Sequence, residues 1–178
     1  MATQTQYAWA AGFFDGEGCA SIQRQKGYYC ARLHVVQKDI RPLEHFQQVF
    51  GLTEKLHTVT RSNRRHKYYR LTVSGARAAE ILTLMLPYLT LKREVAEAVI
   101  DLQAAVAGVT YQERLAGLTD AEKARRDVLY QRAKWLNSGR WAAATTKPSG
   151  PATEPGCDSL NCTDGKGAEV AETTTRLQ

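Results

Sequence analysis

Residues 7–18, a run of small and aromatic residues that ends in alternating acids and glycines, constrain the fold of this chain most strongly. Ala8, Ala11 and Gly12 recur at helical spacing, so we expect a helix with one face bare enough for another backbone to pack closely against it. A glycine past the last turn accepts the left-handed conformation that other residues resist, and we therefore expect the helix to end between Asp15 and Gly18.

Asp15 and Glu17 bring two carboxylates to the expected end of this helix, with Gly16 between them. If two copies of the helix packed face to face, their Glu17 carboxylates would meet at one point. This stretch alone leaves an ordinary helix with a glycine cap open as the alternative, so the rest of the chain has to decide between the two interpretations.

The positive charge of the chain is concentrated in one segment. The formal net charge is +6 over 178 residues, but residues 20–75 alone carry 11 Lys and Arg against 3 Asp and Glu, a local net charge of +8. Such a concentration favours a polyanion-binding surface over charge that serves only solubility, although a solvated basic face remains open.

Alternation of apolar and polar residues after the first helix predicts two hairpins. The first is expected over residues 19–25 and 28–38, and the second over residues 56–61 and 68–73. In three of the strands the apolar residues share one face, as expected for an antiparallel sheet with one buried side. The faces of the third strand stay unassigned.

Further helices are expected over residues 42–50, 74–86, 92–106 and 119–137. Gly51 and Pro87 should end the first two of these helices, and Ser74 should cap the second. Thr119 opens the last in a capping-box pattern. The order αββα, then ββα, then two added helices predicts an α+β fold with a four-stranded antiparallel sheet and helices on one face.

We expect one folded domain over residues 1–141 and a flexible tail over residues 142–178, where Thr, Pro, Gly and small residues dominate without periodicity. No apolar run reaches the roughly 20 residues that span a bilayer, so no membrane partner is expected. The polar start of the chain argues against a secretory leader, which predicts an intracellular location with reduced thiols, in a bacterial or phage-host cytoplasm or in an organelle.

Residues 10–18, Ala-Ala-Gly-Phe-Phe-Asp-Gly-Glu-Gly, resemble the nine-residue signature of the LAGLIDADG homing endonuclease family, with Ala10 in place of Leu and Glu17 in place of the usual Asp. The resemblance implies the αββαββα fold of that family. A chain with one copy of the motif supplies half of an active site, so it also implies a homodimer of the single-motif type. The residues expected in the dimer interface are Ala8, Ala11, Gly12 and Asp15.

Two further stretches, residues 35–41 and 86–92, resemble the segments that bring a Gln, an Arg and a Lys close to the scissile phosphate in single-motif members. The resemblance implies that Gln37 orders water, that Arg41 neutralises the phosphate and that Lys92 is a cation beside the attacking water or the phosphate. Together with Glu17 these are the candidate catalytic residues. A structural or surface role stays open for each of them.

A divalent metal ion, expected to be Mg²⁺, fits the acidic end of the first helix. Phosphodiester hydrolysis needs a nucleophilic water, stabilised phosphoryl oxygens and help for the leaving alkoxide, and a pair of metal ions supplies all three. Mg²⁺ keeps several waters, so one or two carboxylates suffice for each ion. Glu17 of each subunit and the carbonyl of Gly16 meet this need, and the longer side chain of Glu leaves the metal preference open.

The polar face of the expected sheet is the candidate DNA-binding surface, because a twisted antiparallel ribbon fits the major groove of a duplex, which is about 12 Å wide. The residues that fall on this face by parity are Ser21, Gln23, Gln25, Arg32, His34, Arg70 and Thr72. Loop residues expected to contact phosphates are Arg61, Arg64, Arg65 and Lys67.

The sequence thus predicts a homodimeric, metal-dependent endonuclease that cuts both strands of a long, nearly palindromic double-stranded DNA site. The resemblance implies cleavage across the minor groove with short 3′ overhangs. Two alternatives stay open. One is an intron maturase that assists splicing and has host intron RNA as its partner, and the other is a catalytically inactive DNA-binding protein on the same fold.

Overall fold

The computed structural model describes residues 2–25, 28–59, 67–109 and 117–139. Its elements are α1 (Gln4–Glu17), β1 (Gly18–Gln25), β2 (Tyr28–Gln37), α2 (Ile40–Phe50), β3 (His57–Val59), β4 (Tyr68–Ser74), α3 (Ala76–Met85), the 3₁₀ helix η1 (Leu86–Tyr88), α4 (Arg93–Ala107) and α6 (Asp120–Asn137). The predicted domain boundary after residue 141 lies outside the described residues. Of the described helices, none is both long and apolar enough to cross a membrane.

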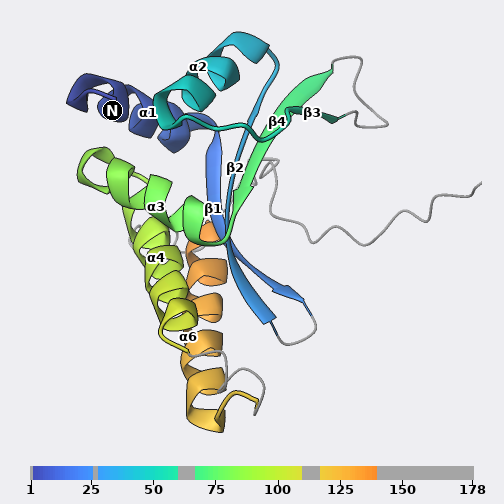
Figure 1. The fold of residues 1–178 in the computed structure, drawn as a ribbon, viewed down its shortest axis with the longest axis vertical. Coiled ribbons are helices and arrows are strands. Elements are labelled where there is room, and N and C mark those ends of the chain that lie inside the picture. The colour runs from blue at the N-terminus through green and yellow to red at the C-terminus, as the bar shows by residue number, and fades with distance from the viewer. Residues whose placement is uncertain (1, 26–27, 60–66, 110–116, 140–178) are drawn as a thin grey trace, which may run out of the picture. The chain divides into compact units, whose positions relative to one another are not determined.

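The four strands form one antiparallel sheet in the order β1-β2-β4-β3. β2 and β4 are therefore central, and β1 and β3 are the edges. The helices pack on one face of this sheet (Figure 1). The arrangement confirms the predicted α+β fold, in which a four-stranded antiparallel sheet is covered on one side.

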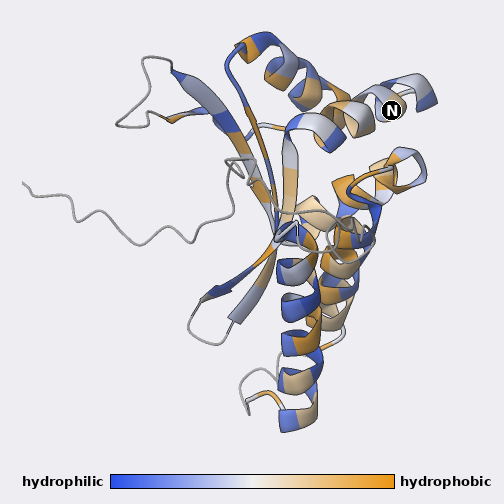
Figure 2. Ribbon diagram, turned by 180° about the vertical axis from the view of Figure 1, so that it is seen from behind, coloured by the Kyte–Doolittle hydropathy of each residue, from blue (hydrophilic) through white to orange (hydrophobic). Residues whose placement is uncertain are grey.

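Side chains alternate between the two faces of the sheet, so hydrophilic and hydrophobic bands follow one another along the strands (Figure 2). The helix-covered face is apolar and buries Leu33 and Val35 of β2 together with Leu71 and Val73 of β4, each with at most 1% of its surface exposed. These residues join the apolar sides of the helices in one core, as the alternation predicts. We call the opposite, polar side of the sheet the open face.

The pairing of β3 with β4 shows which β3 residues lie on each face of the sheet, a point that the sequence leaves undecided. His57 pairs with Arg70, and Val59 pairs with Tyr68. His57 and Val59 therefore lie on the open face together with these partners. Leu56 falls on the other side, where it is partly buried against the core.

The junction between α1 and β1 differs from the prediction. The helix continues through Glu17, and Gly18 then adopts an extended conformation with φ −90° and ψ 166°, so the expected left-handed cap is wrong. Glycine is required here for space, because a Cβ on Gly18 would lie 2.1 Å from a ring carbon of Phe14. The Phe14 ring thus packs directly over the backbone where the helix becomes a strand.

The ends of the two middle helices give one confirmed and one wrong prediction. Gly51 ends α2 in the left-handed region (φ 60°), as predicted. Asp39, which the sequence analysis did not identify, caps the start of α2 by accepting the N–H of Arg41 at 3.0 Å. Ser74 does not cap α3, because β4 extends through it, and Gly75 precedes the helix without a side-chain cap.

α6 belongs to the folded unit and packs on α4 and β1. It begins at the predicted cap, Thr119, whose hydroxyl accepts a backbone N–H of the first turn at 3.2 Å. The Nδ2 of Asn137 donates to the Ala20 carbonyl at 2.8 Å, and Asp127 accepts the hydroxyl of Tyr29 at 2.9 Å. These contacts cover edge strand β1, which would otherwise present unpaired backbone groups.

Candidate active site and nucleic-acid interface

Asp15 connects the end of α1 to the start of α4. Its Oδ2 accepts the N–H groups of Thr90 at 2.7 Å and Leu91 at 3.2 Å, and its Oδ1 accepts that of Lys92 at 2.9 Å. A carboxylate in this place satisfies donors that have no intrahelical partner and interacts favourably with the positive end of the helix dipole. These contacts support a structural role for Asp15 rather than a metal-binding one.

Lys92 makes the reciprocal contact with α1. Its Nζ donates to the carbonyl of Phe14 at 2.9 Å and to that of Asp15, and it lies 5.8 Å from the centroid of the Phe14 ring. The ammonium group therefore stabilises the negative end of α1. The structure thus brings this candidate catalytic cation to the helix end that carries Glu17.

Glu17 is the last residue of α1, and both Glu17 and Gly16 are exposed. Within the described part of the chain, the Glu17 carboxylate makes no hydrogen bond or ion pair, and no three side chains of His, Cys, Asp or Glu gather to form a metal site. The carboxylate and the Gly16 carbonyl are the hard oxygen donors that Mg²⁺ prefers. An ion held there would take its other ligands from water, substrate or a second subunit.

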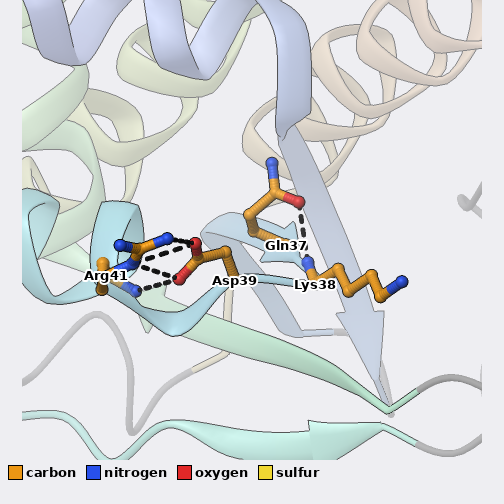
Figure 3. Close-up of polar contacts among 4 residues, drawn as sticks. All are labelled: Gln37, Lys38, Asp39 and Arg41. Carbon is orange, nitrogen blue, oxygen red and sulfur yellow. Dashed lines mark hydrogen bonds and ion pairs between the residues drawn. The ribbon is translucent and has the colours of Figure 1, made fainter.

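Gln37 ends β2 beside the junction of α1 and β1. The β1–β2 ladder ends at the pair of Gly18 with Val35, and Gln37 lies two residues further along β2. Its Oε1 accepts the N–H of Lys38 at 2.7 Å, and its amide group is turned away from Arg41 (Figure 3). Of the two candidates at this strand end, Gln37 lies closer along the chain to Val35, whose partner Gly18 directly follows Glu17.

Arg41, in the first turn of α2, forms an ion pair with Asp39, the N-cap residue of the same helix. Its Nε donates to both carboxylate oxygens of Asp39 at 3.0 Å, and its Nη2 donates to the same carboxylate (Figure 3). These hydrogen bonds hold the pKa of Asp39 at about 2. The side chain of Arg41 is 84% exposed, and its hydrogen bonds and ion pair within the described structure are all to Asp39.

The candidate dimer face of α1 includes Ala8 and Gly12 but not Ala11. Ala8 and Gly12 are exposed, and a Cβ on Gly12 would meet no atom within 4 Å. Ala11 has no exposed surface and lies in the core of its own subunit, which corrects the prediction that it shares this face. Trp9 is 37% exposed next to this surface and stacks on Phe13, with 5.4 Å between the ring centroids.

Most of the candidate DNA-contacting residues share the open face. By strand register these are Ser21, Gln23, Arg32, His34, Arg70 and Thr72. Lys67 precedes β4 and is exposed. Four predicted contacts lie outside the described residues, namely the side chain of Gln25 and the loop residues Arg61, Arg64 and Arg65.

Further residues lie on the open face that were not among the candidate DNA contacts, and they include Cys19, Tyr68 and His57. Cys19 pairs with His34, and Tyr68 follows the same alternation that places Arg70, so this pattern could have identified both. His57 gave no such signal, because the short strand that carries it shows no clear alternation.

His34 lies among positive charges on the open face. Burial, followed by the charges of Arg70, Arg32 and Lys92, lowers its pKa to about 4, so the imidazole is neutral at neutral pH. The Nδ1 of His34 and the Nε of Arg32 are buried without a hydrogen-bond partner in the described structure. A surface with several cations and spare donors suits a polyanion with many acceptor oxygens.

The sequence matches the LAGLIDADG endonuclease family over residues 10–96. No curated protein sequence matches the chain closely enough to count as a relative.

Three solved structures with a similar fold are homing endonucleases bound to DNA. The homing endonuclease I-CvuI in complex with the I-CreI target in the presence of Mg is 22% identical with a TM-score of 0.57, covering 75% of this chain and 82% of its own. The archaeal intron-encoded I-Vdi141I complexed with DNA is 14% identical with a TM-score of 0.56, covering 74% and 84%. The I-LtrWI endonuclease bound to target DNA is 17% identical with a TM-score of 0.58, covering 89% and 55%.

Proposed function

The chain belongs to the LAGLIDADG endonuclease family, and we propose that it is a homodimeric homing endonuclease that uses divalent metal ions to cut both strands of a long, nearly palindromic DNA site. One observation carries this proposal: the exposed carboxylate of Glu17 ends a helix whose outward side is small and apolar. The similar solved structures are complexes with DNA, which supports DNA as the substrate.

A second copy of the chain is the proposed partner of α1. The helix buries Phe14 in the core of its own subunit and exposes Ala8 and Gly12 on the other side. A helix that is apolar on both sides needs cover on both, and small residues allow a second helix to approach closely. Two-fold pairing through this face would bring the two Glu17 carboxylates together and would match two similar half-sites in the DNA.

Mg²⁺ is the proposed cofactor, with Glu17 and the Gly16 carbonyl as its ligands from each subunit. When bound, such an ion polarises a phosphoryl oxygen and lowers the pKa of a bound water. Lys92, held on the last turn of α1 by two carbonyls, places a fixed positive charge beside the phosphate. Gln37 has its Oε1 occupied by Lys38, so its amide N–H groups are left to position a water molecule.

Arg41 is proposed to bind a phosphate by exchanging its partner. The ion pair with Asp39 is exposed, and exposed ion pairs contribute little to stability, so a phosphate can replace the carboxylate at small cost. This assignment makes Arg41 a DNA-binding residue at the rim of the site, with the reacting atoms left to Glu17 and Lys92.

The open face of the sheet is proposed to enter the major groove. Its Gln, Arg and His side chains carry the donors and acceptors that read base edges. Lys67 and the loop residues Arg61, Arg64 and Arg65, which the sequence predicts as phosphate contacts, are proposed to bind the DNA backbone. Contacts of the second kind are expected to weaken with added salt and to depend little on DNA sequence.

Glu17→Gln tests the catalytic proposal. The target is first obtained by selecting cleaved members of a randomised duplex library with Mg²⁺ present. Glu17→Gln should lose double-strand cleavage of this target by roughly a hundredfold or more, because the ligand loses its charge, while duplex binding persists. Glu44→Gln, which changes an exposed acid on α2, is the matched control and should cut normally. Cleavage that survives in Glu17→Gln would overturn the mechanism.

The same experiment separates the alternatives. An inactive DNA-binding protein would bind a selected duplex but would not nick it at any Mg²⁺ concentration. An intron maturase would need neither the exposed Glu17 carboxylate nor the Lys92 ammonium at the helix end for RNA binding, so splicing activity would survive Glu17→Gln. Sedimentation equilibrium tests the dimer independently of both.

A further inference from the structure

His34 is the titratable group at the centre of the open face. It projects from β2 directly between Cys19 of β1 and Thr72 of β4. The charged groups that act on it come from three elements: Arg32 from the same strand, Arg70 from β4 and Lys92 from the start of α4. All three are cations, and no carboxylate of the described residues is among the charges that shift the pKa of His34.

The polar atoms of this cluster are only partly satisfied by the protein. Arg32 lies two residues from His34 on the same side of β2, and its Nε is buried without a hydrogen-bond partner in the described structure, as is the Nδ1 of His34. Buried donors without acceptors are costly, and cations held close together raise the free energy of one another. Both costs fall when acceptor-rich, negatively charged groups arrive from outside.

We propose that His34 takes up a proton when a DNA duplex binds to the open face. The proposal rests on the proposed function, because it takes the duplex as the ligand of this face. Phosphates and base acceptors near Arg32 and Arg70 would offset the field that keeps the imidazole neutral. The imidazolium has N–H donors on both ring nitrogens and forms stronger, charge-assisted hydrogen bonds to the ligand.

Linkage fixes the direction and the range of this effect. DNA that raises the proton affinity of His34 must itself bind more tightly to the protonated protein by the same factor. The pKa of His34 is about 4 in the free protein, and its ordinary value is about 6.5. DNA affinity should therefore gain at most about tenfold for each pH unit as the pH falls from about 6.5 toward about 4.

Fluorescence anisotropy with a labelled random-sequence duplex measures this linkage. Wild type, His34→Gln and the control His45→Gln, which removes a histidine from α2, are titrated at fixed ionic strength across this pH range. Affinity should rise more steeply on acidification for wild type and His45→Gln than for His34→Gln. Equal slopes for wild type and His34→Gln would overturn the linkage while leaving DNA binding intact.

Two measurements on wild type avoid dependence on a variant that fails to fold. Calorimetric titration in buffers of different ionisation enthalpy should report proton uptake on binding. NMR titration of the His34 ring should show a higher pKa with the duplex than without it, and an unchanged pKa would overturn the proposal. Absence of duplex binding at every pH would instead overturn the proposed function, and the linkage with it.

Discussion

The two faces of the sheet are built from alternate residues of the same strands, yet they solve different physical problems. On the helix-covered face, Leu33 and its neighbours are fully buried and need nothing from outside the chain. On the open face, Arg32 and His34 keep polar atoms buried without hydrogen-bond partners in the described structure. Buried polar atoms without partners are unfavourable for folding and tend to occur at functional sites. We therefore interpret the helix-covered face as serving stability and the open face as serving binding.

Truncating two adjacent residues of β2 tests the difference between the two faces most directly, because the two variants should differ most in stability. Leu33→Ala is expected to lower the free energy of unfolding by about 2–5 kcal/mol, because it leaves a cavity in the core. Arg32→Ala removes a guanidinium whose Nε has no hydrogen-bond partner among the described residues, and it should change that free energy by about 1 kcal/mol or less. Urea denaturation measures both, and similar losses for the two variants would contradict the division between the faces.

Acid should destabilise the fold through the open face. The folded chain keeps His34 neutral down to a pKa of about 4, whereas the unfolded chain binds the proton near its ordinary pKa of about 6.5. Stability is therefore lost as the pH falls between these values, by up to about 3 kcal/mol, and His34 adds no slope above them. Urea titrations at several pH values should show a flatter profile for His34→Gln, and identical profiles would argue against a neutral, partly buried His34.

Gly12 within α1 and Gly18 directly after it offer a second contrast between a packed position and an exposed one. Gly18→Ala forces a Cβ into the Phe14 ring and should cost about 1–3 kcal/mol of stability. Gly12→Ala meets open space and should stabilise an isolated subunit by up to about 1 kcal/mol, because Ala favours the helix. Denaturation tests both. Sedimentation equilibrium should in addition show weaker dimers for Gly12→Ala, and unchanged association would argue against this dimer face.

Strand faces were predictable because the period of two acts within a few residues. Leu33 and Val35 against Arg32 and His34 follow from alternation alone, and the end of α2 at Gly51 follows from local turn chemistry. The same logic failed at β3, which is too short to show a period and takes its faces from its register with β4.

The misses arise where tertiary contacts decide. Small residues occur on both sides of α1, so spacing could not tell that Ala11 is buried while Gly12 is exposed. The need for glycine at position 18 comes from the Phe14 ring rather than from φ. The bonds from Asp15 to the start of α4 join residues 75–77 positions apart, and no local pattern signals them.

The link from Asp15 to Thr90 and Lys92 bears on any attempt to transplant the site. Residues 90–92, which lie far from α1 in the sequence, hold the final turn of this helix in place. Their backbone N–H groups donate to the Asp15 carboxylate, and the Lys92 ammonium donates to the carbonyl of Phe14 in α1. A graft of the signature helix into another scaffold would leave that carboxylate without its donors. The smallest portable unit is therefore the helix together with residues 90–92, and a designer should move them as a pair.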